Sequence, residues 1–242
     1  MSGPVNGIIV AVTFRATMGR RRALLFAAPA IVLIAVAAVL AATAVSGSWR
    51  PEFLAAFGFT IVLPLTSLII GTSVLGAEID DGSVVHLLAT PVPRSQVVLS
   101  KFLVAAGLTI VFGAIPEYLG AAIAAGPGSR LAVGLLAGAV AAAVIYNAIF
   151  VMLSAVTSRA IAIGLIYLLV WEGLLANLVP GVGLLSAGQY SLSIANSIAN
   201  NKALNAHLSI STAVIMALIV TVVALVICVR KLSVFSIRGD AA

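Results

Sequence analysis

Charged residues are almost absent from six long stretches of this chain, and that absence limits what the chain can fold into. Only 8% of the 242 residues are charged and 62% are hydrophobic, and the mean hydropathy is +1.25. A soluble domain carries about 25% charged residues, whereas a helix that crosses a bilayer needs about 20 mostly apolar residues. The sequence therefore predicts an all-α integral membrane protein and excludes a water-soluble fold.

The apolar stretches predict six transmembrane helices within a single transmembrane domain, residues 1–242. We place these helices at residues 23–45, 53–76, 96–125, 131–157, 160–179 and 210–229. Pro64 lies near the middle of the second, where its missing N–H leaves a backbone carbonyl that must find another partner. The fourth is rich in alanine and glycine, which favours close contact with neighbouring helices.

Two further segments are predicted to lie at the membrane surface. In residues 5–20, apolar side chains recur at helical spacing, at Val5, Ile8, Ile9 and Val12. This pattern predicts an N-terminal amphipathic interfacial helix, and docking of that helix on the protein's own bundle is the alternative. Residues 182–208 are rich in Ser and Asn, too polar to span the membrane, and we expect short extracytoplasmic helices there.

The positions of the basic residues predict the orientation of the chain. With six spans both termini lie on one side of the membrane. That side receives ten of the 13 Lys and Arg residues: Arg15, Arg20, Arg21, Arg22, Arg94, Lys101, Arg159, Arg230, Lys231 and Arg238. The other side receives Arg50, Arg130 and Lys202. By the positive-inside rule, both termini are expected in the cytoplasm, with the protein in a bacterial plasma membrane.

The densest group of charges lies between the second and third predicted spans. The residues of interest are Glu78, Asp80, Asp81, Gly82, Ser83, His86, Leu87, Pro91, Arg94 and Lys101. Acidic residues favour the positive end of a helix dipole, and proline ends a helix. We therefore predict a short cytoplasmic helix at residues 78–90, and an ordinary solvated loop is the alternative.

This group resembles the intracellular loop of permeases in the ABC type-2 exporter superfamily. There a Glu-x-x-x-Gly-Thr/Ser start, a Leu-rich turn, a Pro-x-x-Arg and a later Lys mark the coupling helix. The matching residues are Glu78, Gly82, Ser83, Leu87, Leu88, Pro91, Arg94 and Lys101. Ser83 stands where threonine is commoner and keeps the hydroxyl. The resemblance extends along the chain, from the interfacial N-terminal helix to the external segment before the last span.

The resemblance implies the permease subunit of an ATP-driven exporter. In that family two six-span units form the substrate pathway, and each coupling helix docks on an ATP-binding subunit. A second permease copy, as a homodimer, is therefore expected, with ATP and Mg²⁺ on the partner subunit and no cofactor on this chain. The residues agree on one point: the sequence contains no Gly-x-x-x-x-Gly-Lys-Ser/Thr phosphate loop. The chain is not expected to be an enzyme by itself.

Two acidic residues lie inside predicted spans, Glu117 in the third and Glu172 in the fifth. An ionisable residue within a membrane is a functional candidate by default. Both carboxylates are therefore candidates for lining a cationic-substrate path or its outer gate. Alternatively, hydrogen bonds to Ser, Thr, Tyr118, Tyr167 or Asn147 fix helix packing. Both interpretations stay open at this level.

Other classes of function fit the sequence less well. An intramembrane serine protease needs a Ser and a His at one depth, but the predicted topology places His86 and His207 on opposite sides of the membrane. The same separation argues against a metal site. A proton-coupled secondary transporter using Glu117 and Glu172 is the main alternative, although no paired repeat is visible. A structural scaffold would explain neither acid.

No aromatic-interleaved basic groove indicates nucleic acid. Drugs, peptides, lipids and polymer precursors remain open as substrates.

Overall fold

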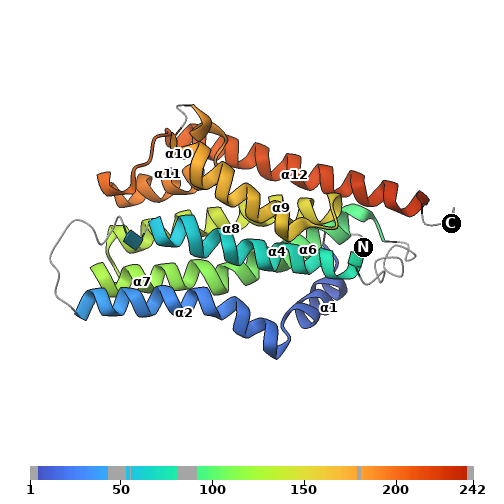
Figure 1. Ribbon diagram of the computed structural model, residues 1–242, viewed down its shortest axis with the longest axis horizontal. Helices are drawn as coiled ribbons and strands as arrows, with labels where there is room; N and C mark the ends of the chain where they lie inside the picture. Colours follow the sequence, from blue (N-terminus) through green and yellow to red (C-terminus); the bar gives the residue numbers. More distant parts are fainter. Residues whose placement is uncertain (1–4, 43–52, 55, 81–91, 179–180, 239–242) are drawn as a thin grey trace.

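The chain folds into an elongated bundle of helices that lie along one another (Figure 1). The computed structural model describes residues 5–42, 53–54, 56–80, 92–178 and 181–238. Every regular element within these residues is a helix. The predicted all-α class is confirmed for this part of the chain.

Among the described residues of the first half of the chain, two π-helical turns and five α-helices are present. They are α1 (Gly7–Thr17), α2 (Arg20–Ala42), η1 (Gly58–Val62), α4 (Leu63–Asp80), α6 (Arg94–Thr109), η2 (Ile110–Ala114) and α7 (Ile115–Ala125). Of these, η1 and η2 are the π-helical turns. Because η1 runs into α4 and η2 joins α6 to α7, each forms part of a longer continuous helix.

In the described part of the second half there are one more π-helix, η3, and two short 3-10 helices, η4 and η5. Its elements are α8 (Arg130–Val156), α9 (Ala160–Ile166), η3 (Tyr167–Leu175), α10 (Ala176–Leu178), η4 (Val182–Leu185), α11 (Ala187–Ala199), η5 (Lys202–Leu204) and α12 (Ile210–Arg238). α9, η3 and α10 follow one another without a break.

Five helical segments of the described residues are long and apolar enough to cross a membrane. They are Arg22–Val39, Gly58–Gly76, Arg94–Ala125, Arg130–Val156 and Ile210–Val234. Each coincides with one of the predicted spans. The remaining prediction, residues 160–179, contains a shorter apolar helix at Ala160–Leu175. The chain is thus a multi-pass membrane protein, and the six-span layout stays a prediction.

The two ends of the described chain lie at the same end of the bundle. Figure 1 shows α1, the last turns of α12, the end of α4 and the start of α6 together there, with α11 toward the opposite end. This arrangement is what an even number of crossings requires. The cytoplasmic location of that end stays a prediction.

α1 packs on the bundle through one face and exposes apolar side chains on another. Ile9, Thr13 and Thr17 are buried, whereas Ile8 and Val12 are 77% and 60% exposed. α1 contacts mainly α6. α1 is therefore docked on the protein's own bundle, which was the alternative to an interfacial helix. Its exposed apolar side chains are also compatible with a position at the membrane surface.

The π-helical turns η1 and η2 each end two residues before a proline, Pro64 and Pro116 respectively. Proline has no N–H to donate, and its ring collides with the carbonyl four residues earlier in an α-helix. In η1 the Leu63 N–H instead donates to the carbonyl of Gly58, five residues back. η2 shows the same pattern. The wider turns therefore accommodate both prolines without breaking the helices.

α8 is the central helix of the bundle, since α4, α7, α11 and α12 all pack against it. Its contact with α11 is the closest. A methyl group added at Gly134 would lie 2.6 Å from the carbonyl oxygen of Ala195. One added at Gly138 would lie 2.6 Å from the carbonyl oxygen of Ser191. Small residues allow this approach of two backbones, and we call Gly134 and Gly138 the glycine seam.

The segment before the last span contains η4, α11 and η5, and the extracytoplasmic location predicted for it stays a prediction. α11 is more than a surface helix, because it lies lengthwise on α8 (Figure 1). Tyr190 and Ser191 on it are fully buried. Its N-cap is Ser186, whose hydroxyl accepts a hydrogen bond of 3.1 Å from the Gln189 N–H.

Gly138→Ala is expected to weaken the contact between α8 and α11. The new methyl group overlaps α11 backbone, and overpacking of this kind costs about 1–3 kcal/mol. A lower melting temperature of the purified protein in detergent is the expected result. Gly107→Ala on α6 is the matched control, because its methyl group meets no described atom within 4 Å. Equal losses in the two variants would contradict the tight seam.

Candidate functional site

A buried ion pair joins the end of α4 to α6. The Lys101 Nζ lies 2.5 Å from a carboxylate oxygen of Glu78 and donates a second hydrogen bond of 3.0 Å to the Val74 carbonyl. Lys101 is 1% exposed and Glu78 is 28% exposed. A buried charge is tolerated only with a partner. The pair therefore fixes the two helices to each other where the chain leaves and re-enters the bundle.

The other residues predicted for the docking helix are placed only in part. Glu78 and Asp80 lie in the last turn of α4, and Arg94 is the first residue of α6. Asp81, Gly82, Ser83, His86, Leu87 and Pro91 lie outside the described residues. The helix predicted at residues 78–90 thus begins within α4, and the rest of it is not described.

Glu117 lies inside the bundle with its carboxylate against η1. It stands in the first turn of α7, is fully buried, and neither of its carboxylate oxygens has a hydrogen-bond partner among the described residues. A methyl group added at Gly58 would fall within 2.5 Å of both oxygens. The hydrogen bonds expected of a structural role are therefore not found for this acid in the described part of the chain. A buried carboxylate without such bonds is costly.

Glu172 has the opposite environment. Its carboxylate accepts hydrogen bonds from the hydroxyls of Tyr167 at 2.7 Å and Ser186 at 2.5 Å. It also accepts bonds from the backbone N–H groups of Ala187 at 2.8 Å and Gly188 at 3.3 Å. These N–H groups begin α11, where the helix dipole favours a negative charge. Glu172 thus fastens the start of α11 to η3, and Tyr167 is one of the partners that the structural alternative names.

A small polar cavity lies beside Glu172 and has a volume of about 40 Å³. Its lining residues are Phe59, Thr60, Tyr146, Glu172, Ala176, Ser186, Gly188, Gln189 and Leu192. Two of these belong to η1, the same π-helical turn whose Gly58 contacts Glu117. η1 therefore lies between the two intramembrane acids. Its Gly58 faces Glu117, and its Phe59 and Thr60 line the cavity beside Glu172.

Sequence reasoning missed both the position of η1 between the two acids and Ser186 as a partner of Glu172. A signal for Ser186 exists, because Ser186-Ala187-Gly188-Gln189 has the spacing of a helix-capping box. No comparable signal pairs Gly58 with Glu117, since the two residues belong to different helices and meet only through packing.

Gly58→Ala is expected to destabilise the protein only while Glu117 is present. The added methyl group overlaps the carboxylate, which costs about 1–3 kcal/mol of overpacking. In the Glu117→Ala background that overlap disappears, so most of the loss should vanish. Melting temperatures of the wild type, the two single variants and the double variant give the coupling. Strictly additive changes would contradict the contact.

Comparison with known proteins adds the family. The profile of the ABC-2 family transporter protein matches residues 19–179. The match runs from the start of α2 to the end of α10 and includes Glu78, Lys101, Glu117 and Glu172. No curated protein matches the chain. Since the matched region covers about two thirds of the sequence, this multi-pass membrane protein belongs to the ABC-2 family of transporter proteins, as a transport permease.

Proposed function

We propose that the chain is the permease subunit of an ATP-driven exporter and forms the substrate pathway together with a second copy. ABC-2 permeases normally pair with an ATP-binding subunit. The proposal assigns ATP and Mg²⁺ to that partner, and it assigns the termini and the segment at residues 81–91 to the cytoplasm of a bacterium. The positive-inside charge bias supports this orientation.

The observation that carries the proposal is the buried pair of Lys101 and Glu78. It stands at the base of the segment whose residues resemble a coupling helix. Because Lys101 binds both the Glu78 carboxylate and the Val74 carbonyl, the ends of α4 and α6 respond as one unit to a force on that segment. Both helices pack against α8, so such a displacement reaches the centre of the bundle.

The two intramembrane acids receive different roles in this proposal. Glu117 is the gating residue, because its carboxylate is buried against Gly58 with no hydrogen bond among the described residues. Separation of α7 from η1 would let water reach it, and this gain in solvation favours the open state. Glu172 is a positioning residue, since four donors already hold it at the start of α11.

A second copy has apolar surface available to it. α2 exposes Leu24, Leu25 and Ile31, and α12 exposes Leu218 and Val222. In a bilayer these apolar faces are covered either by lipid chains or by another protein surface, since both are apolar. The homodimer would take part of this surface and lipid the remainder.

Reversal of one charge in the α4–α6 pair is expected to uncouple the permease from its ATP-binding partner. In Glu78→Lys and Lys101→Glu, like charges meet where one side chain is buried and the other is partly exposed, and a buried charge without its partner destabilises the fold. The double swap restores the attraction and should recover part of the function. The readouts are co-purification of the ATP-binding subunit and ATPase activity per folded permease, with melting temperature as the folding check.

Lys202→Glu is the matched control for these variants, because Lys202 is exposed in η5. Equal ATPase activity in both single variants, the swap and the wild type would overturn the coupling role. Export of a candidate compound by vesicles that lack the ATP-binding subunit would overturn the proposal itself. If a protonophore then abolished that export, a proton-coupled transporter would be the better description.

Glu117→Gln is expected to stabilise the closed bundle and slow turnover. The amide has nearly the same size and removes the cost of burying a carboxylate charge, which exceeds the cost of burying a neutral amide. The corresponding measurements are a higher melting temperature and lower partner-dependent ATPase activity. Glu172→Gln is the comparison, and it should melt lower because α11 loses the anion at its start. A lower melting temperature for Glu117→Gln would remove its gating role.

A further inference from the structure

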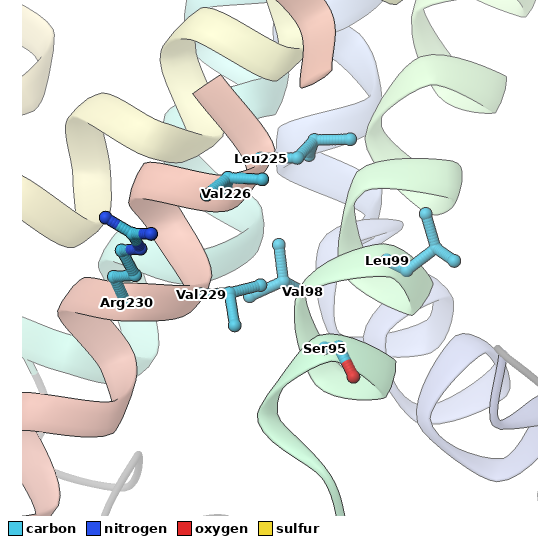
Figure 2. A pocket seen from close by; sticks show the side chains of 7 residues that line it. All are labelled: Ser95, Val98, Leu99, Leu225, Val226, Val229 and Arg230. Carbon is cyan, nitrogen blue, oxygen red and sulfur yellow. The ribbon is translucent and has the colours of Figure 1, made fainter. Parts of the chain in front are cut away.

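An apolar groove opens between the start of α6 and the end of α12 (Figure 2). It has a volume of about 390 Å³. α6 contributes Ser95, Val98 and Leu99, and α12 contributes Leu225, Val226, Val229 and Arg230. Figure 2 shows Val98 and Val229 pointing toward each other across it. The groove lies toward the end of the bundle that also holds α1 and the last turns of α12 (Figure 1).

The groove is polar at one end and apolar along its depth. Ser95 stands in the first turn of α6, and Arg230 follows the apolar run of α12. Leu225 lies five residues before Arg230, which corresponds to about 7.5 Å along a helix. Five of its seven lining residues are aliphatic. The ligand that fits such a gradient has a polar head and an apolar chain.

The charge at the polar end is positive. Arg230 and Lys231 are exposed on α12, and neither α6 nor α12 contains an acidic residue. Figure 2 shows the Arg230 stem at the rim and its guanidinium extending out of the groove. An exposed arginine of this kind keeps its head in water beside an apolar surface. The N-terminal end of α6, which has no side-chain cap, adds positive potential.

We propose that this groove binds one anionic phospholipid. The acyl chain lies on Val98, Leu225 and Val229, and the phosphate lies at the mouth near Ser95 and Arg230. Basic sites between transmembrane helices attract anionic headgroups, and each Lys or Arg near the surface contributes about 1 kcal/mol. Val226, which lines the groove, is also exposed on the outer face of α12, which gives a lipid a route of entry. This site requires only that the chain be embedded in a membrane.

Native mass spectrometry of the delipidated full chain tests the site. The protein is titrated with phosphatidylglycerol and with phosphatidylcholine that carries the same acyl chains. One phosphatidylglycerol is expected to be retained more tightly than phosphatidylcholine. Arg230→Gln should weaken phosphatidylglycerol retention roughly fivefold, the equivalent of one surface cation. Arg159→Gln, an exposed cation that does not line the groove, should leave retention unchanged.

A second pair of variants tests the apolar part. Val226→Trp fills the groove and should abolish retention, whereas Val222→Trp, one turn away and outside the lining, should not. Both positions are exposed, so folding is expected to survive, and the melting temperature checks it. Equal retention of the two lipids, or retention unaffected by Val226→Trp, would overturn the proposal. Loss of a protein dimer on Val226→Trp, with lipid retention unchanged, would assign the groove to a second copy instead.

Discussion

Backbone hydrogen bonding is the constraint on which this bundle depends, because hydrocarbon offers no partner to an unpaired N–H or carbonyl. Pro64 and Pro116 would each break that pairing inside an α-helix. The π-helical turns η1 and η2 precede them and keep both helices continuous. The same turns bring Gly58 against Glu117. The third π-helix, η3, carries Glu172. The three π-helical segments of the described residues therefore lie beside the intramembrane acids.

Glu117 and Glu172 are the same residue type, but their carboxylates have very different hydrogen-bonding environments. Glu172 receives at least four hydrogen bonds and lies where a helix begins, so its charge is compensated locally. Glu117 is fully buried, yet its oxygens meet no hydrogen-bond donor among the described residues. The first arrangement stabilises one geometry. The second makes the buried geometry costly, and the gating role proposed for Glu117 rests on this cost.

Much of the architecture was predictable from the sequence, because a membrane span depends on the apolar length of one segment. Five apolar spans and the all-α character of the described residues belong to this class. The contact between Gly58 and Glu117 and the α6–α12 groove do not. They depend on how each helix is rotated toward its neighbours, and rotation is set by packing surfaces that no single segment contains. Residues 160–179 are intermediate, since composition predicts a span there and the observed apolar helix is shorter.

The glycine seam also has a consequence for the order in which the protein assembles. α8 precedes α11 in the chain, so a ribosome releases Gly134 and Gly138 before it has made the helix that covers them. The partners of Glu172 on α11 appear equally late. α4, which packs elsewhere on α8, is already present by then. During synthesis, the contact between α8 and α11 therefore forms only after α4 and α7 have been made, with α12 still to come, and truncation before α11 leaves the seam uncovered.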